Sequence, residues 1–188
     1  MKGVRTFIGI FPPAELQSKI ADIGAAFNVE SSGVRWEHQS KFHVTVKFLG
    51  EVPAHQLSRL RDILIDRAQT IPYFKIQLLA FGCFPTARSP RIVWIGSSRE
   101  ENTSLVECAE AIEESCAQLG FKKEERVFHP HITIGRVKGK IPENLIKTIE
   151  NTTFEPLKFP CAELLVMKSD LSPSGSTYSK QCTISLKQ

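Results

Sequence analysis

The sequence predicts a fold of mixed helices and strands that is built from two similar halves. Apolar residues recur at three- and four-residue steps in several segments, as on the buried side of amphipathic helices. Shorter segments between them alternate or run apolar, which is typical of strands. The order strand, helix, strand, helix, strand occurs twice in the 188 residues. A chain of this length suits one domain or two small fused lobes.

The first half starts with a strand at 5–10. Pro12 and Pro13 then open a helix, because proline is tolerated in the first helical turn. A polar loop at 31–33 leads to residues 34–36 and to a strand at 42–49, which Gly50 ends. After Val52-Pro53 a second helix is expected, followed by a strand region within 73–84. The two helical stripes are Leu16, Ile20, Ile23 and Phe27, then Leu57, Leu60, Ile63, Leu64 and Ala68.

The second half follows the same plan. A strand at 91–96 resembles the strand at 5–10 down to its leading arginine, and the helix after it is stopped by Gly120. A strand at 131–137 precedes a helix that Pro142 opens, and a further strand is expected at 163–168. A turn-rich loop at 172–176 leads to a closing strand at 178–186. We therefore predict one bilobal domain over 1–188, with a first repeat at about 4–84 and a second at about 90–170.

Both halves contain a short motif with the same spacing, His43-Val-Thr-Val and His131-Ile-Thr-Ile. In a strand, alternate side chains point to opposite faces, so each histidine lies beside its threonine on the face away from the apolar residues. One such strand is often only a solvent-facing edge. Two copies, 88 residues apart, favour a single site to which each lobe brings its His-Thr face, across a shared cleft.

Two facing histidines suit acid–base chemistry near neutral pH. An imidazole with an ordinary pKa of about 6.5 can be neutral or charged there, so one ring can take a proton and the other can give one. The hydroxyls of Thr45 and Thr133 can hydrogen-bond phosphate oxygens. This near-symmetry leaves open which histidine is the acid. No metal or cofactor is implied, although His129 and His131 form an HxH pair that can also bind a metal.

Cationic side chains are further candidates for holding a phosphate. Lys47 shares the His43 face if the strand alternates strictly. Arg136 would then lie opposite Thr133, so a phosphate role for it requires a bulge or a strand end. Arg91, with Arg88, flanks a loop that could follow an RNA backbone. Among the aromatic residues, Phe48 and Trp36 are core residues or a platform for a base, and Tyr178 is a candidate for closing the cleft.

The composition is compatible with this chemistry but does not require it. The net charge of +4 and the pI of about 8.8 permit a polyanionic partner. Five cysteines without a CxxC pair indicate small buried thiols. No apolar run approaches the roughly 20 residues that a membrane-spanning helix needs, and the N-terminus lacks signal-peptide features. We expect a cytoplasmic protein.

Taken together, several stretches resemble the two-histidine (2H) phosphoesterases with paired HxTx motifs, and in particular the RNA 2′,3′-cyclic phosphodiesterases, long called 2′-5′ RNA ligases. The departures are small: Lys41-Phe42 stands where Asn-Leu is common, and His129 occupies a variable position. The stretches that carry the resemblance are Arg5-Thr-Phe-Ile, Val34-Arg-Trp, His43 to Val52, Phe84 to Arg91, Gly120-Phe, Phe128 to Arg136, and Leu171 to Tyr178.

The resemblance implies an α+β, bilobal fold with two antiparallel sheets around a central cleft, related by a pseudo-two-fold axis, and helices outside. It implies hydrolysis of RNA 2′,3′-cyclic phosphate ends to 2′-phosphates without a metal or cofactor, with His43 as proton donor and His131 as proton acceptor. Thr45 and Thr133 would hold the phosphate. We expect the protein to be a monomer. The alternatives are small cyclic nucleotides, ADP-ribose cyclic phosphate or 2′-5′ oligonucleotides as substrates, the reverse 2′-5′ ligation, or a non-catalytic RNA-end binder.

Overall fold

The computed structural model describes residues 3–27, 33–173 and 175–187. It confirms the mixed α+β class, and every pairing between its named strands is antiparallel. Ser31, Ser32 and Ser174, which were expected in loops, lie outside the described residues. The strands are β1 (Val4–Ile10), β2 (Val34–Trp36), β3 (Val44–Val52), β4 (Phe74–Leu78), β5 (Ala80–Phe84), β6 (Ile92–Gly96), β7 (His131–Val137), β8 (Leu157–Cys161), β9 (Glu163–Ser172) and β10 (Gly175–Ser185). The helices are α1 (Ala14–Ala25), α2 (Ala54–Ala68), α3 (Thr103–Gln118) and α4 (Glu143–Asn151), with 3-10 turns η1 (Gln39–Lys41) and η2 (Glu100–Asn102).

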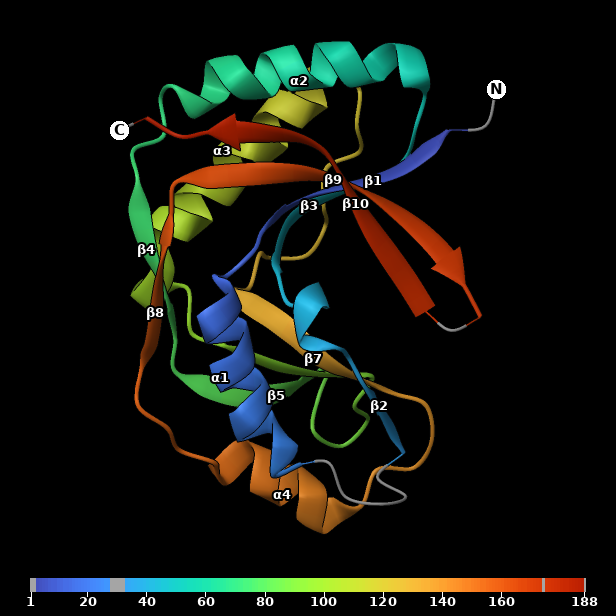
Figure 1. Ribbon diagram of the computed structural model, residues 1–188, viewed down its shortest axis with the longest axis vertical. Coiled ribbons are helices and arrows are strands. Elements are labelled where there is room, and N and C mark those ends of the chain that lie inside the picture. Colours follow the sequence, from blue (N-terminus) through green and yellow to red (C-terminus); the bar gives the residue numbers. More distant parts are fainter. Residues whose placement is uncertain (1–2, 28–32, 174, 188) are drawn as a thin grey trace.

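Eight of the strands form one sheet in the order β10-β9-β1-β3-β7-β6-β5, with β2 added beside β7. The two expected sheets are therefore its two halves, which meet where β3 pairs with β7. A separate two-stranded sheet, β4 with β8, runs along the side of the molecule and connects the halves (Figure 1). Helices α2 and α3 cover one half, and α1 and α4 cover the other (Figure 1).

The two halves exchange strands. In chain order β1 to β5 precede β6, and β6 to β9 repeat the same succession of strands and helices except that β2 has no counterpart. Yet β5 pairs with β6, and β9 pairs with β1, so each half of the sheet contains a strand from the other half of the sequence. The β4–β8 pair also joins the two halves of the sequence. The lobes are thus closely connected by their backbones.

The helical stripes predicted from the sequence pack into the core. Ile20, Leu64 and Ile112 are fully buried, as expected for residues at three- and four-residue steps on one helix side. Helix α3 ends at Gln118, two residues before Gly120, whose φ of 84° favours glycine. Cys108, Cys116 and Cys161 are buried free thiols, as predicted, whereas Cys83 and Cys182 are free thiols that are only half-buried.

Some boundaries differ from the sequence prediction. Strand β3 continues through Gly50, which has a φ of 69° and lies at a register irregularity, and ends at Val52. Strand β8 was not predicted, and β10 begins at Gly175. None of the helices in the described residues is long and apolar enough to cross a membrane.

Candidate active site

The two motif strands lie side by side in the middle of the large sheet. Val44 of β3 is opposite Ile132 of β7, and both are buried in the core. In an antiparallel pair this register puts His43 across from Thr133, and Thr45 across from His131, on the opposite face of the sheet. All four of these side chains are half-buried. We call His43, Thr45, His131 and Thr133 the HxTx face.

Both imidazoles are held in the same tautomer. His43 Nδ1 lies 2.6 Å from the backbone oxygen of Lys41, and His131 Nδ1 lies 2.8 Å from that of His129. A carbonyl oxygen only accepts, so Nδ1 carries the hydrogen and donates it. In the neutral ring, Nε2 is then left able to accept a proton. Each ring can therefore bind and release a proton at Nε2. Because the two hydrogen bonds at Nδ1 are alike, they do not show which histidine is the acid and which is the base.

The two histidines have different surroundings. Three aromatic rings surround His43, with centroid distances of 4.8 Å to Phe7, 5.1 Å to Phe11 and 5.3 Å to Tyr178. The pKa of His43 is lowered to about 4, mainly by this burial, and the positive charges of Arg136 and His131 act in the same direction, whereas the hydrogen bond to Lys41 and the charge of Glu37 oppose it. At neutral pH the His43 ring is therefore uncharged in the free protein.

His131 has fewer aromatic neighbours. Its ring meets that of Phe84 edge-on at 5.0 Å, and that of His129 at 6.1 Å. Burial lowers the pKa of His131 below its ordinary value, and the neighbouring charges of His129 and Arg136 act in the same direction. A negatively charged ligand on this face would favour the charged form of either ring.

A β-bulge moves Lys47 away from this face. Strand β1 pairs with Thr45 and then directly with Lys47, so Val46 is an extra residue and the alternation reverses. The Lys47 side chain is only 3% exposed and donates to Glu113 Oε1 and to the backbone oxygen of Lys122, both at 2.7 Å. The prediction that Lys47 shares the His43 face is therefore wrong, because it assumed strict alternation.

The corresponding bulge in β7 brings Arg136 to the HxTx face. Strand β6 pairs with Thr133 and then with Gly135, so Ile134 is the extra residue, and Arg136 returns to the side of Thr133. The positive charge of Arg136 lowers the pKa values of His43 and His131, which indicates that it lies near both rings. A phosphate role for Arg136 was expected to require such a bulge, because strict alternation would place Arg136 on the face opposite Thr133.

The same bulge in β3 turns Phe48 outward. Phe48 was expected in the core with Val44 and Val46, but it is 43% exposed. The guanidinium carbon of Arg5 lies 4.4 Å from the centre of its ring. Trp36, by contrast, is half-buried against Phe27 at a ring distance of 6.1 Å, as part of the core boundary.

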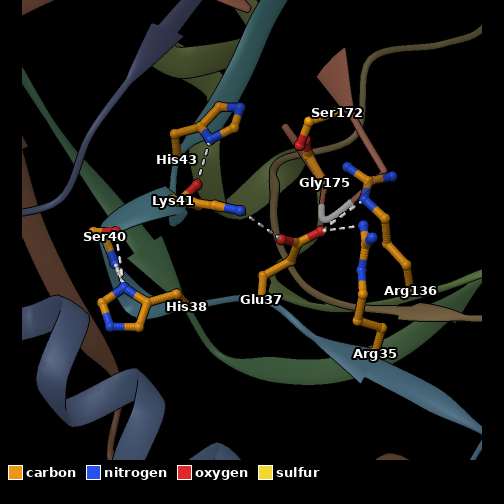
Figure 2. A network of polar contacts seen from close by, with 9 residues as sticks. All are labelled: Arg35, Glu37, His38, Ser40, Lys41, His43, Arg136, Ser172 and Gly175. Atoms are coloured by element: carbon orange, nitrogen blue, oxygen red, sulfur yellow. Dashed lines mark hydrogen bonds and ion pairs between the residues drawn. The ribbon is translucent and has the colours of Figure 1, made fainter. Parts of the chain in front are cut away.

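Glu37 is an important site residue that the sequence analysis did not single out. Its carboxylate is 12% exposed and accepts a hydrogen bond of 2.9 Å from Arg136 Nε. Its oxygens also lie 3.6 Å from Arg35 Nη2 and 3.8 Å from Lys41 Nζ, so three cations surround one carboxylate (Figure 2). Glu37 and Arg136 are 99 residues apart in sequence, and no local pattern indicates their pairing.

The remaining candidates are less directly placed. Arg91 is exposed just before β6, and only its backbone is anchored, by hydrogen bonds with Phe84 and Val137. The ring of His129 lies 5.0 Å from that of Trp94 and 5.1 Å from that of Phe84. Within residues 3–27, 33–173 and 175–187 no three side chains of His, Cys, Asp or Glu lie close enough together to hold a metal ion.

Comparisons with known proteins identify the family of this chain. The sequence model of the 2′-5′ RNA ligase superfamily matches residues 12–173. The chain belongs to the 2′-5′ RNA ligase superfamily. Within it, the chain is 34% identical to the RNA 2′,3′-cyclic phosphodiesterase of Thermotoga maritima, over 93% of this chain and 91% of that one. It is also 34% identical to the protein of the same name from Methanocaldococcus jannaschii, over 93% and 96% of the two chains.

Solved structures of the superfamily have the same fold. The structure of E. coli LigT in its apo form covers all of both chains, with a TM-score of 0.79 and 26% identity. E. coli LigT complexed with 3′-AMP gives the same TM-score and identity over 99% of each chain. The expected family and fold class are thus confirmed.

Proposed function

We propose that this superfamily member hydrolyses 2′,3′-cyclic phosphate ends of RNA to 2′-phosphates. The observation that carries the proposal is the HxTx face itself, where two imidazoles with available Nε2 atoms lie beside two threonine hydroxyls. In the described chain neither hydroxyl of Thr45 and Thr133 has a hydrogen-bond partner, so both can bind phosphate oxygens. The names of the Thermotoga and Methanocaldococcus relatives support this substrate class.

In the proposed reaction His131 Nε2 takes a proton from water, whose oxygen attacks the phosphorus. The bond from phosphorus to the 3′-oxygen breaks, and His43 Nε2 gives that oxygen a proton. The product has a 2′-phosphate and a 3′-hydroxyl, and the enzyme returns to its starting state when a proton moves from His131 to His43 through solvent. We take the assignment of donor and acceptor from the family, since the hydrogen bonds of the two rings are alike.

Charge stabilisation falls to Arg136 in this proposal. Phosphoryl transfer depends mainly on positioning and on stabilising negative charge, and Arg136 is the cation that acts on both histidines. The negative phosphate also favours the protonated form of His43, which the free protein disfavours. Arg91 remains a candidate for contacts with the RNA backbone. Lys47 has no part in the proposed site, because it is buried against Glu113.

We further propose a monomeric, cytoplasmic enzyme whose partner is RNA or an oligonucleotide with a cyclic phosphate end. The five cysteines are free thiols, which suits a reducing compartment.

The first test is the hydrolysis of a nucleoside 2′,3′-cyclic phosphate in the presence of excess chelator, with the product identified by chromatography. His43→Ala and His131→Ala should each lower kcat by about a hundred- to ten-thousand-fold, because each removes one proton transfer. His55→Ala is the matched control, since His55 is exposed at the start of α2 and should keep full activity. Normal turnover by either motif variant would contradict the proposed pairing.

A further inference from the structure

Three cations gather around one carboxylate beside the HxTx face, in a cluster formed by Arg35, Lys41, Arg136 and Glu37. The proposed reaction uses the charge of Arg136 only, so the positive charges of the other two cations have no role in it. Among the residues that the structure describes, all ion pairs of the three cations go to the single carboxylate of Glu37, which leaves an excess of positive charge. The cluster lies beside the reaction site. The backbone oxygen of Lys41 accepts a hydrogen bond from His43 Nδ1 (Figure 2). The charge of Arg136 lowers the pKa of both His43 and His131.

Two of the three cations have unused hydrogen-bond donors. Only Arg136 makes a hydrogen bond to Glu37, at 2.9 Å. The distances of 3.6 Å from Arg35 and 3.8 Å from Lys41 are too long for good hydrogen bonds. Within the described chain the side chains of Arg35 and Lys41 make no hydrogen bond to any other residue. Their side chains are 37% and 26% exposed, so a ligand can reach them.

The side chains of Arg35 and Lys41 both lie close to Gly175, the first residue of β10 (Figure 2). A Cβ atom added to Gly175 would lie 3.5 Å from Arg35 Nη1 and 3.6 Å from Lys41 Nζ. Gly175 has a φ of 126°, a conformation that favours glycine, and the missing side chain keeps this approach open. The two side chains therefore meet at one place, which lies between Gly175 and Glu37.

We propose that Arg35 and Lys41, with Arg136, form a second anion subsite that binds the phosphodiester on the 5′ side of the terminal nucleoside. This inference rests on the proposed function. A strand that ends in a 2′,3′-cyclic phosphate continues only through its 5′-oxygen, so its next negative charge is that phosphodiester. A planar guanidinium and an ammonium with free donors suit its two non-bridging oxygens. Glu37 keeps the three cations together when the subsite is empty.

The subsite predicts a preference for substrates with more than one nucleotide. The test compares a nucleoside 2′,3′-cyclic phosphate with a dinucleotide that has the same cyclic end, and with that dinucleotide carrying a neutral methylphosphonate linkage. For the wild-type protein, kcat/KM should be about tenfold higher for the charged dinucleotide than for the other two substrates, mainly through KM. The methylphosphonate removes the charge from the ligand alone, so protein folding cannot explain its effect.

Variants then locate the subsite. The ratio of kcat/KM for the charged dinucleotide to kcat/KM for the neutral one should fall towards one in two variants, Arg35→Gln and the combination of Arg35→Gln with Lys41→Gln. The decrease of kcat/KM for the charged dinucleotide with rising salt should also become smaller in these variants, because salt then screens fewer attractive charge pairs. Arg61→Gln is the control with the same change of charge, because Arg61 lies exposed on α2 and pairs with Asp62. It should keep the wild-type preference.

The outcomes separate this inference from the proposed function. Equal kcat/KM for the charged and neutral dinucleotides, or a preference that survives in the double variant, would overturn the subsite while leaving cyclic phosphate hydrolysis intact. If the wild-type protein hydrolyses none of the three substrates, the proposed function fails, and the subsite fails with it.

Discussion

His43 should take up a proton only at a pH far below that of a free imidazole. Its ring lies among Phe7, Phe11 and Tyr178, and this burial lowers its pKa from 6.5 to about 4. At pH 7 about one molecule in a thousand then has a charged His43. Because the pKa in the folded protein is below that in the unfolded chain, folding stability should fall as the pH drops from 6.5 towards 4. From pH 7 to pH 5 this contribution is about 2 kcal/mol.

Two measurements check this expectation. NMR of protein with ¹⁵N-labelled histidine follows the titration of the His43 ring directly, between pH 8 and pH 3.5. Urea unfolding at pH 7 and pH 5 gives the loss of stability, and His43→Gln serves as the reference because it lacks the titrating group. The wild-type protein should lose about 2 kcal/mol more than His43→Gln between these two pH values. Added inorganic phosphate should raise the pKa of His43, since an anion favours the charged ring.

A His43 titration near pH 6.5 in phosphate-free buffer would refute the reasoning, and so would a parallel loss of stability in the wild-type protein and His43→Gln. Either result would mean that water reaches the ring in spite of its aromatic neighbours, and that the free enzyme already carries the proton needed for the leaving oxygen.

Three further predictions concern residues around the site. Glu113→Ala should lower the free energy of unfolding, measured in urea, by about 3 kcal/mol, because the Lys47 ammonium is then buried without its carboxylate partner. Lys47→Met combined with Glu113→Leu should restore most of this free energy, because no buried charge remains. The double variant should also keep its activity, whereas it would lose activity if Lys47 bound the substrate. Gly96→Ala should cost about 2 kcal/mol and lower kcat, because the added methyl group would collide with backbone next to the second motif. Tyr178→Ala should raise the pKa of His43 towards 6.5 in an NMR titration, because it exposes the ring to water; an unchanged pKa would show that the tyrosine does not exclude water.

The sequence was sufficient to predict the motif strands and the helices. The alternation in His131 to Val137 gave the bounds of β7, and the apolar stripes of α1 and α2 correspond to buried residues such as Ile20 and Leu64. The placement of each histidine beside its own threonine followed from side-chain alternation alone, because it depends only on neighbouring residues in one short strand. That the two motifs form one site was predicted from their repetition, and the pairing of β3 with β7 brings them together.

What the sequence did not predict depends on contacts between distant segments. One extra residue in each motif strand reverses the alternation, so Lys47 turns into the core and Arg136 turns out of it. Such bulges are defined by the partner strand, and no local pattern in either motif indicates them. The position of Glu37 among three cations similarly requires β2 to pair with β7, which brings together residues about half the chain apart.

The exchange of strands has a consequence for how the protein is made. During synthesis β1 can meet β3 early, but its other neighbour, β9, emerges only after residue 163. Until then one edge of β1 has unpaired backbone groups, which is the kind of edge that promotes aggregation. A nascent chain that stops after residue 84 would therefore lack β9 and β10 on one side of β1, and it would also lack β7, the partner that completes the HxTx face with β3.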